Sequence, residues 1–295
     1  MAPAEQPEIR PSPAGMRWPG GRNVAVVFNV AYEMWSDGAT SGVGPMGNPL
    51  PAGCFDPNAD SYGRYGATTG IRRLMRALDR AGVQANVFTS GLLAERQPDQ
   101  VRAVAEAGHE IVAHGWAQNL IPATLDAAED DRLIRATTEA LEAVTGTRPR
   151  GWISPRATPA VDTARRLVAQ GYGWQGDALD TDLPYLQRYP EGELIAVPLT
   201  IEINDLSHGM RFGRTPGQFV ELFNETLAHL LADPEDVVIL DVLVHTHCYG
   251  RAGGAWAYAE IARSCAARDD IWITTRGAIA DHFRAALGGR LAAAQ

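Results

Sequence analysis

Short apolar runs alternate with amphipathic segments along most of the chain. Runs of β-branched and aromatic residues predict buried strands, and apolar residues three or four positions apart predict helices with one buried face. The predicted strands cover 23–30, 83–88, 109–113, 173–175, 194–198 and 237–244. The predicted helices cover 69–81, 98–107, 126–145, 162–170 and 216–231, and segments 261–268, 271–274 and 277–287 complete the chain. Thr124 is the expected N-cap of helix 126–145, and Gly146 is its expected end.

This alternation, with no linker and no internal repeat, predicts parallel strands joined by crossover helices. A nearly closed barrel and an open doubly wound sheet both satisfy it. The nucleotide-binding version is disfavoured, because neither a Gly-x-Gly-x-x-Gly loop nor a Walker loop follows the first strand. We expect a single α/β domain over residues 18–295, preceded by a flexible arm at 1–17.

One long segment, residues 34–66, departs from the alternation because it is rich in glycine and proline and has no usable periodicity. It leaves the C-terminal end of the first strand, where α/β folds build their sites. Long irregular loops inside compact domains are usually functional. We interpret the segment as a loop that covers a site; a surface excursion or an oligomer contact is the alternative.

Composition narrows the partners. The chain has 295 residues and a net charge of −9, and no stretch concentrates lysine or arginine, so nucleic acid is not an expected partner. Cys54, Cys248 and Cys265 are far apart and form neither a disulfide framework nor a Cys-x-x-Cys knuckle, which suits a reducing compartment. No signal-like N-terminus and no apolar run of about 20 residues is visible. The expectation is a soluble, cytoplasmic protein without a membrane partner, acting on a small molecule.

Polar side chains gather where the predicted strands end. Glu33 and Asp37 follow the first strand, His114 ends the third, and His245 and His247 close the most hydrophobic one. In a parallel barrel these ends converge on one rim, so separated segments can share a pocket. Tryptophans near the same strand ends suggest a partly apolar pocket for a small flat substrate.

These segments resemble the polysaccharide deacetylase (NodB-homology) superfamily, and the likeness runs from about Trp18 to Phe283. The motifs that carry it are Gly108-His109-Glu110-Ile111-Val112-Ala113-His114-Gly115, Gly151-Trp152 with Pro155-Arg156, Asp182-Leu183-Pro184-Tyr185, and His245 with Gly250-Arg251. The pattern is most similar to the branch with metal-independent allantoinases and cyclic-imide hydrolases. The resemblance implies a distorted (β/α)7 barrel, hydrolysis of an amide C–N bond, and a homo-oligomer.

The chain departs from the sugar deacetylases of the superfamily at their metal ligands. Their first motif contains two aspartates, whereas the corresponding stretch is taken here as Phe28-Asn29-Val30-Ala31. Their second motif contains two histidines, whereas here His114 is followed by Gln118. Two mechanisms stay open: a divalent metal such as zinc held by Glu33, His114 and His245 or His247, with His247 preferred, or metal-free activation of water by Glu33 or a histidine.

The predicted function is hydrolysis of a non-peptide C–N bond in a small molecule, such as a cyclic imide or ureide. A carbohydrate de-N-acetylase and a catalytically inactive binding barrel are the alternatives. The predicted catalytic residues are Glu33, His114, His245, His247 and Arg156, with Arg156 stabilising the oxyanion. The predicted substrate-binding residues are Trp35, Asp37, Trp116, Trp152, Asp177, Asp182 and Asn204.

Overall fold

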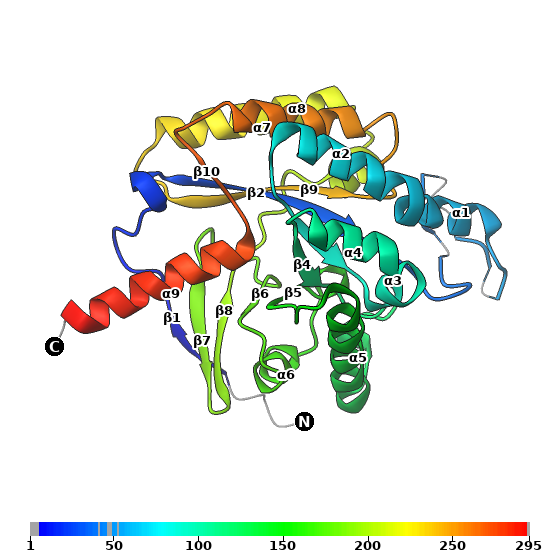
Figure 1. The fold of residues 1–295 in the computed structure, drawn as a ribbon, viewed down its shortest axis with the longest axis horizontal. Coiled ribbons are helices and arrows are strands. Elements are labelled where there is room, and N and C mark those ends of the chain that lie inside the picture. The colour runs from blue at the N-terminus through cyan, green and yellow to red at the C-terminus, as the bar shows by residue number, and fades with distance from the viewer. Residues whose placement is uncertain (1–5, 41, 46–48, 52, 294–295) are drawn as a thin grey trace.

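The computed structural model describes residues 6–40, 42–45, 49–51 and 53–293. Its centre is a curved sheet of parallel strands (Figure 1). In hydrogen-bonded order these strands are β9 (Val238–His245), β2 (Val24–Tyr32), β3 (Asn86–Thr89), β4 (Glu110–Ala113), β5 (Gly151–Trp152), β6 (Trp174–Gln175) and β8 (Gly192–Ala196). The sheet stays open between β8 and β9, apart from one parallel bridge between Asn204 and Leu243. The predicted distorted (β/α)7 barrel is therefore confirmed.

Three further strands extend the sheet. β10 (Trp272–Thr274) pairs with the first half of β2, and β3 pairs with the second half of the same edge. β7 (Tyr185–Tyr189) forms an antiparallel hairpin with β8, and β1 (Glu8–Arg10) pairs with β7. Residues 8–10 of the predicted flexible arm are thus part of the sheet, whereas residues 1–5 lie outside the described residues.

Helices surround the sheet. They are α1 (Pro57–Tyr65), α2 (Ile71–Ala81), α3 (Gly91–Arg96), α4 (Pro98–Glu106), α5 (Ala127–Thr145), α6 (Thr163–Ala169), α7 (Pro216–Ala232), α8 (Ala255–Ala266) and α9 (Arg276–Ala293). Short 3₁₀ segments are η1 (Pro19–Gly21), η3 (Pro122–Thr124) and η4 (Pro155–Ala157), and π-helical segments are η2 (Gly66–Gly70) and η5 (Leu206–Arg211). Within the described ranges, no helix combines the length and the apolar character needed to span a bilayer.

Successive residues of β2 serve two different cores, because side chains alternate between the faces of a strand. Val24, Val26 and Phe28 belong to the larger core, beneath α2, α7 and α8, which cover this side in Figure 1. Ala25 and Val27 belong to the second core, inside the barrel, where α9 contributes Ile279 and Phe283. The face of β2 that points into the barrel therefore carries the odd-numbered residues, and Glu33 continues this series just beyond the C-terminal end of the strand.

Two predictions about local structure are wrong. Residues 57–65, expected in the irregular segment 34–66, form α1, because Pro57 occupies its first turn and the Asp56 carboxylate accepts hydrogen bonds from the N–H groups of Asn58 and Ala59. The N-cap of α5 is Asp126, which accepts from Glu129 N, and not Thr124, which lies in η3. Gly146 ends α5 in the left-handed conformation, as predicted.

Candidate active site

A cavity of about 340 Å³ opens at the carboxyl ends of the parallel strands. Most of its wall is apolar, a composition typical of small-molecule sites, and its volume lies at the small end of their range. The polar side chains on the wall come from strand ends and the turns after them: Glu33, His114, Arg156, Asn204, Ser207, Arg211 and His245. Four of the five predicted catalytic residues therefore share one cavity.

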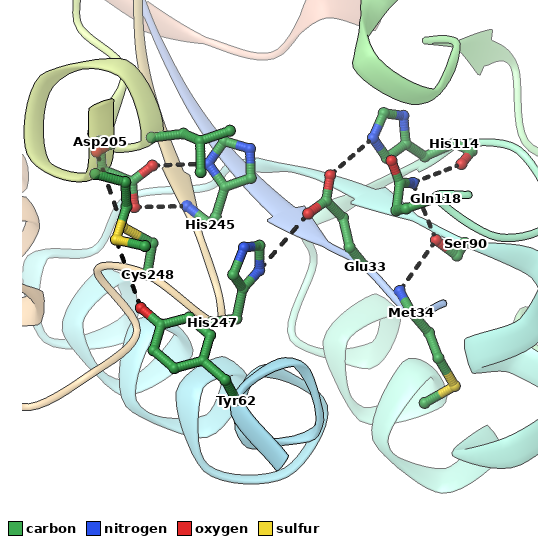
Figure 2. Close-up of polar contacts among 12 residues, drawn as sticks. Glu33, Met34, Tyr62, Ser90, His114, Gln118, Asp205, His245, His247 and Cys248 are labelled. Carbon is green, nitrogen blue, oxygen red and sulfur yellow. Dashed lines mark hydrogen bonds and ion pairs between the residues drawn. The ribbon is translucent and has the colours of Figure 1, made fainter. Parts of the chain in front are cut away.

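Glu33 lies between two histidine rings (Figure 2). Its Oε1 is 3.4 Å from His114 Nε2, and its Oε2 is 3.6 Å from His247 Nδ1. The opposite nitrogen of His114, Nδ1, donates to the carbonyl of Ile153 at 2.7 Å, which fixes the ring so that Nε2 faces the carboxylate. Glu33 is 8% exposed, so its negative charge is shielded from water and acts strongly on the neighbouring rings.

His245 is held by Asp205, a residue that the sequence analysis did not include in the site. Asp205 is fully buried, and its Oδ1 accepts from His245 Nδ1 at 2.7 Å. Its Oδ2 accepts from the backbone N–H groups of His245 and Tyr249, each at 2.9 Å. The second ring nitrogen of His245, Nε2, is left free of Asp205, and the ring lines the cavity.

Burial and neighbouring charges move the pKa values of Glu33, His245 and His247 in different directions. Burial raises the pKa of Glu33, but His245, His114 and His247 together outweigh it and hold that pKa at about 2. Burial lowers the pKa of His245, but Asp205 and Glu33 reverse this and bring it to about 9. At His247 burial prevails and the pKa falls to about 4. At neutral pH an ionised carboxylate therefore lies beside a protonated and a neutral histidine.

His247 contacts Glu33 from outside the cavity. It does not line the 340 Å³ cavity; its ring meets the edges of Trp35 at 5.2 Å and of Tyr62 at 6.1 Å between centroids. The π-helical segment η2 packs closely over the same turn: a Cβ atom at Gly70 would lie 1.9 Å from the carbonyl oxygen of Thr246. Only glycine allows this approach, and a Cβ atom at Gly66 would likewise lie 2.8 Å from the backbone nitrogen of His247, so η2 fixes the turn that carries His247.

The remaining predicted residues lie at varied distances from this cluster. Asn204 lines the cavity, and Arg156 stands at its edge. Trp35 and Asp37 instead line a second cavity of about 190 Å³, which shares Glu33 with the first. There Asp37 is exposed and forms an ion pair with Arg96 at 2.7 Å.

Besides Trp35 and Asp37, four further predicted substrate-binding residues do not line the 340 Å³ cavity. Trp152 is 1% exposed and packs against Tyr172, because its side chain lies on the face of β5 that points into the core. Trp116 packs against the first turn of α3. Asp177 accepts hydrogen bonds from Ser154 N and Oγ, both at 2.7 Å, and Asp182 is exposed.

The expected ligand replacement at Asn29 and Gln118 has a structural reason. Asn29 lies inside β2 and donates to Asp241 at 2.7 Å, so its side chain does not reach the cavity, and Glu33 is the acidic residue that does. Gln118 turns away from the cavity and donates to Ser90 Oγ at 3.3 Å and to the carbonyl of His114 at 3.2 Å.

The predicted metal ligands Glu33, His114 and His247 meet, but their donor atoms do not form a metal site. Each histidine nitrogen faces a different oxygen of Glu33, His114 Nε2 at 3.4 Å from Oε1 and His247 Nδ1 at 3.6 Å from Oε2. Among the residues that the structure describes, no group of three His, Cys, Asp or Glu side chains is arranged to hold a metal ion. The arrangement fits a hydrogen-bonded acid–base cluster better than a coordination sphere.

Comparison with known proteins identifies the class. The polysaccharide deacetylase family matches residues 54–174. The peptidoglycan deacetylase of Helicobacter pylori is 21% identical over 285 residues, which cover 86% of this chain and 95% of that protein. Among solved structures, a candidate polysaccharide deacetylase of Mycobacterium smegmatis has a TM-score of 0.80 at 27% identity, covering 94% of this chain and 96% of the other. The PuuE allantoinase has a TM-score of 0.78 at 26% identity, covering 91% and 92%.

The predicted resemblance to the polysaccharide deacetylase superfamily is confirmed: the family model matches residues 54–174, and solved structures named as polysaccharide deacetylases are similar over at least 90% of the chain. The chain is an enzyme of the class that hydrolyses amide C–N bonds.

Proposed function

We propose that this enzyme hydrolyses a C–N bond in a small cyclic imide or ureide by attack of water, without a metal ion. The observation that carries the proposal is the Glu33 carboxylate, which lies 3.4 Å from His114 and shares a cavity with the Asp205-bound His245. A carboxylate held ionised beside a histidine held protonated is a base and an acid available at the same pH.

In the proposed reaction, a water molecule next to Glu33 attacks the substrate carbonyl and gives its proton to the carboxylate. The carbonyl oxygen becomes an oxyanion, stabilised by the positive charge of the arginines that line the cavity, Arg156 and Arg211. The C–N bond then breaks as His245 Nε2 gives its proton to the departing nitrogen. The proton on Glu33 returns to His245 and restores the starting state.

The low pKa of Glu33, about 2, makes it a weak base at the start of the reaction. The largest cause that lowers this pKa is the charge of His245. His245 keeps this charge while water is attacking and loses it when it protonates the departing nitrogen; the proton held by Glu33 then restores it. Asp205 allows this exchange, since its carboxylate holds the His245 ring in one orientation in both protonation states.

The size and wall of the cavity support the proposed substrate class. A volume of about 340 Å³ suits a single small ring. Apolar side chains such as Phe88, Ile153 and Leu199 offer flat contact surface to a ring. The similarity to the PuuE allantoinase supports the same class.

A carbohydrate de-N-acetylase is the second candidate, because the curated relatives include a peptidoglycan deacetylase that matches 86% of this chain. That reaction also cleaves an amide by attack of water. The two candidates differ in substrate, so release of acetate from N-acetylated sugars would favour the second.

The proposal is tested by assaying cyclic imides, cyclic ureides and N-acetylated sugars with the intact protein and with His114→Ala. Ring opening by the intact protein and its loss in His114→Ala, with the fold retained by circular dichroism, is the expected result. His229→Ala, an exposed histidine of α7, is the matched control and should keep full activity. Full activity in His114→Ala would remove the proposed centre, and tight binding without turnover would identify a binding barrel.

A further inference from the structure

Two arginines, Arg156 and Arg211, line the cavity wall, and within the described part of the chain neither forms an ion pair with a carboxylate. The chain offers many possible partners, because it has 35 acidic residues against 26 basic ones. Some surface arginines elsewhere use them: Arg132 contacts Glu129 at 2.8 Å, and Arg188 contacts Glu193 at 2.6 Å. What sets Arg156 and Arg211 apart from other described arginines without an ion pair, such as Arg214, is that both line the cavity that contains Glu33 and His245.

The backbone at Arg156 is strained. Arg156 has φ of 59° and Ala157 has φ of 48°, and these are the only non-glycine residues with positive φ in the described ranges. Holding such residues costs of order 1–3 kcal/mol each, and strain of this kind clusters at functional sites. The turn is held by Ser154, whose carbonyl accepts from Ala157 N at 2.8 Å and whose hydroxyl is bound by Asp177. Asp177 thus fixes the turn that presents Arg156.

Arg211 ends the π-helical segment η5, an element often found at functional sites. Ser207 lies four residues before Arg211, and both line the cavity. Asp205, directly before η5, is the residue that orients His245. One short element therefore positions the proposed acid and presents a guanidinium group to the same cavity.

The wall of the 340 Å³ cavity carries more basic than acidic side chains. Glu33 is the one carboxylate among the lining residues, and it faces His114 and His247. Leu179, Ile201 and Leu206, which line the same cavity, are apolar and exposed. No second carboxylate among the lining residues is available to Arg156 and Arg211, so a neutral ligand would leave them unpaired.

We propose that the substrate carries a carboxylate, and that Arg156 and Arg211 bind it while the ring amide faces Glu33 and His245. The planar guanidinium fork matches the two oxygens of a carboxylate. The substrate class becomes a small cyclic amide or ureide with a carboxylate on the ring. This inference rests on the proposed function for the reaction, but its binding step can be measured separately.

The test uses two rings that differ only by a carboxylate, dihydroorotate and dihydrouracil, with binding measured by calorimetry. The acid is expected to bind at least about tenfold more tightly than the neutral ring, as charged hydrogen bonds contribute. Arg211→Gln and Arg156→Gln should each weaken binding of the acid about tenfold and leave the neutral ring unchanged. Arg214→Gln, an exposed arginine just outside η5, is the matched control and should change neither.

Binding and turnover separate the two proposals. Equal binding of the two rings, or equal losses for both rings in the arginine variants, would overturn the carboxylate assignment whatever hydrolysis shows. Preferred binding of the acid without hydrolysis of either ring would support the carboxylate site and count against the proposed function. Inorganic phosphate that displaces the ring more effectively than acetate does would overturn the choice of a carboxylate over a phosphoryl group.

Discussion

Two clusters of buried polar side chains lie along β2 and β9, and the second is four residues further along each chain segment than the first. The deeper cluster joins Asn29 of β2 and Asp241 of β9 to Arg276, and the rim cluster joins Glu33 and His245 to their neighbours. Both positions face the barrel interior, as strand alternation requires. The clusters differ in what their charges are paired with.

The deeper cluster is sealed and electrically balanced. Asp241 and Arg276 are fully buried and contact each other at 2.5 Å, and Arg276 also donates to the carbonyls of Val197 and Pro198. Neither residue lines any of the five cavities described for the molecule. Within the described residues, each cluster has one buried nitrogen without a hydrogen-bond partner, Arg276 Nε in the deeper cluster and His247 Nδ1 at the rim, but at the rim Glu33 borders two cavities. Buried charge and incomplete pairing therefore do not mark a site by themselves; a buried charge that borders a cavity does.

The largest expected effect comes from breaking the deeper pair. Arg276→Met leaves Asp241 buried without its cation, which costs about 3–5 kcal/mol of unfolding free energy. Urea unfolding followed by circular dichroism measures the loss. Arg284→Met, on the exposed side of α9, should stay within about 0.5 kcal/mol of the original protein. A loss no larger than that of the control would show that the deeper pair does not stabilise the barrel.

A smaller effect is expected when Asp205 is neutralised. His245 has a raised pKa of about 9, so activity should fall as pH rises through that value. In Asp205→Asn, the carboxylate no longer opposes the effect of burial, so the pKa of His245 should fall. The alkaline limb of the pH profile of kcat/KM should then move to lower pH, and kcat/KM at neutral pH should fall about 10–100-fold. The matched control is Asp236→Asn, an exposed aspartate. An unchanged alkaline limb in Asp205→Asn would mean that His245 is not the proposed acid.

The same histidine predicts a pH dependence of stability. Because its folded pKa is raised, the stabilisation is fully present below the ordinary histidine pKa and is lost as pH rises through about 9. Unfolding free energies at pH 6 and pH 10 should differ more in the original protein than in His245→Gln. Equal differences would assign the pH dependence to other groups.

The smallest effect is expected from removing metal ions. Chelators should leave activity unchanged, and the purified protein should contain far less than one metal ion per chain, because no group of three His, Cys, Asp or Glu side chains among the described residues is arranged to hold a metal ion. Elemental analysis beside activity measures both. Activity that disappears with a chelator and returns with zinc would contradict this account of the rim cluster.

Sequence patterns predicted the barrel well because its strands are short apolar runs with long helices between them. They missed α1, although Asp56-Pro57 is a helix-start signal, because the surrounding glycines dominated the segment. The β7–β8 hairpin was missed in part, since only one of its strands is strongly apolar.

For the site, residues at strand ends were predictable and their partners were not. Glu33, His114 and His245 meet because parallel strands end at one rim. Asp205 contacts His245 across 40 positions of sequence, and Arg211 reaches the cavity only through the irregular turn η5. Trp152 was expected in the pocket because the motif ends at the rim, but the strand directs its side chain into the core. Such contacts depend on tertiary packing, which no local pattern encodes.

The central claim is that Glu33 activates water for attack on an amide, and a steady-state assay of Glu33→Gln tests it most directly. The variant removes the charge and keeps the shape, with Glu139→Gln, an exposed glutamate of α5, as its control. The account predicts that kcat/KM for ring opening falls about 10²–10⁴-fold while the protein stays folded. Activity equal to that of the control would contradict it.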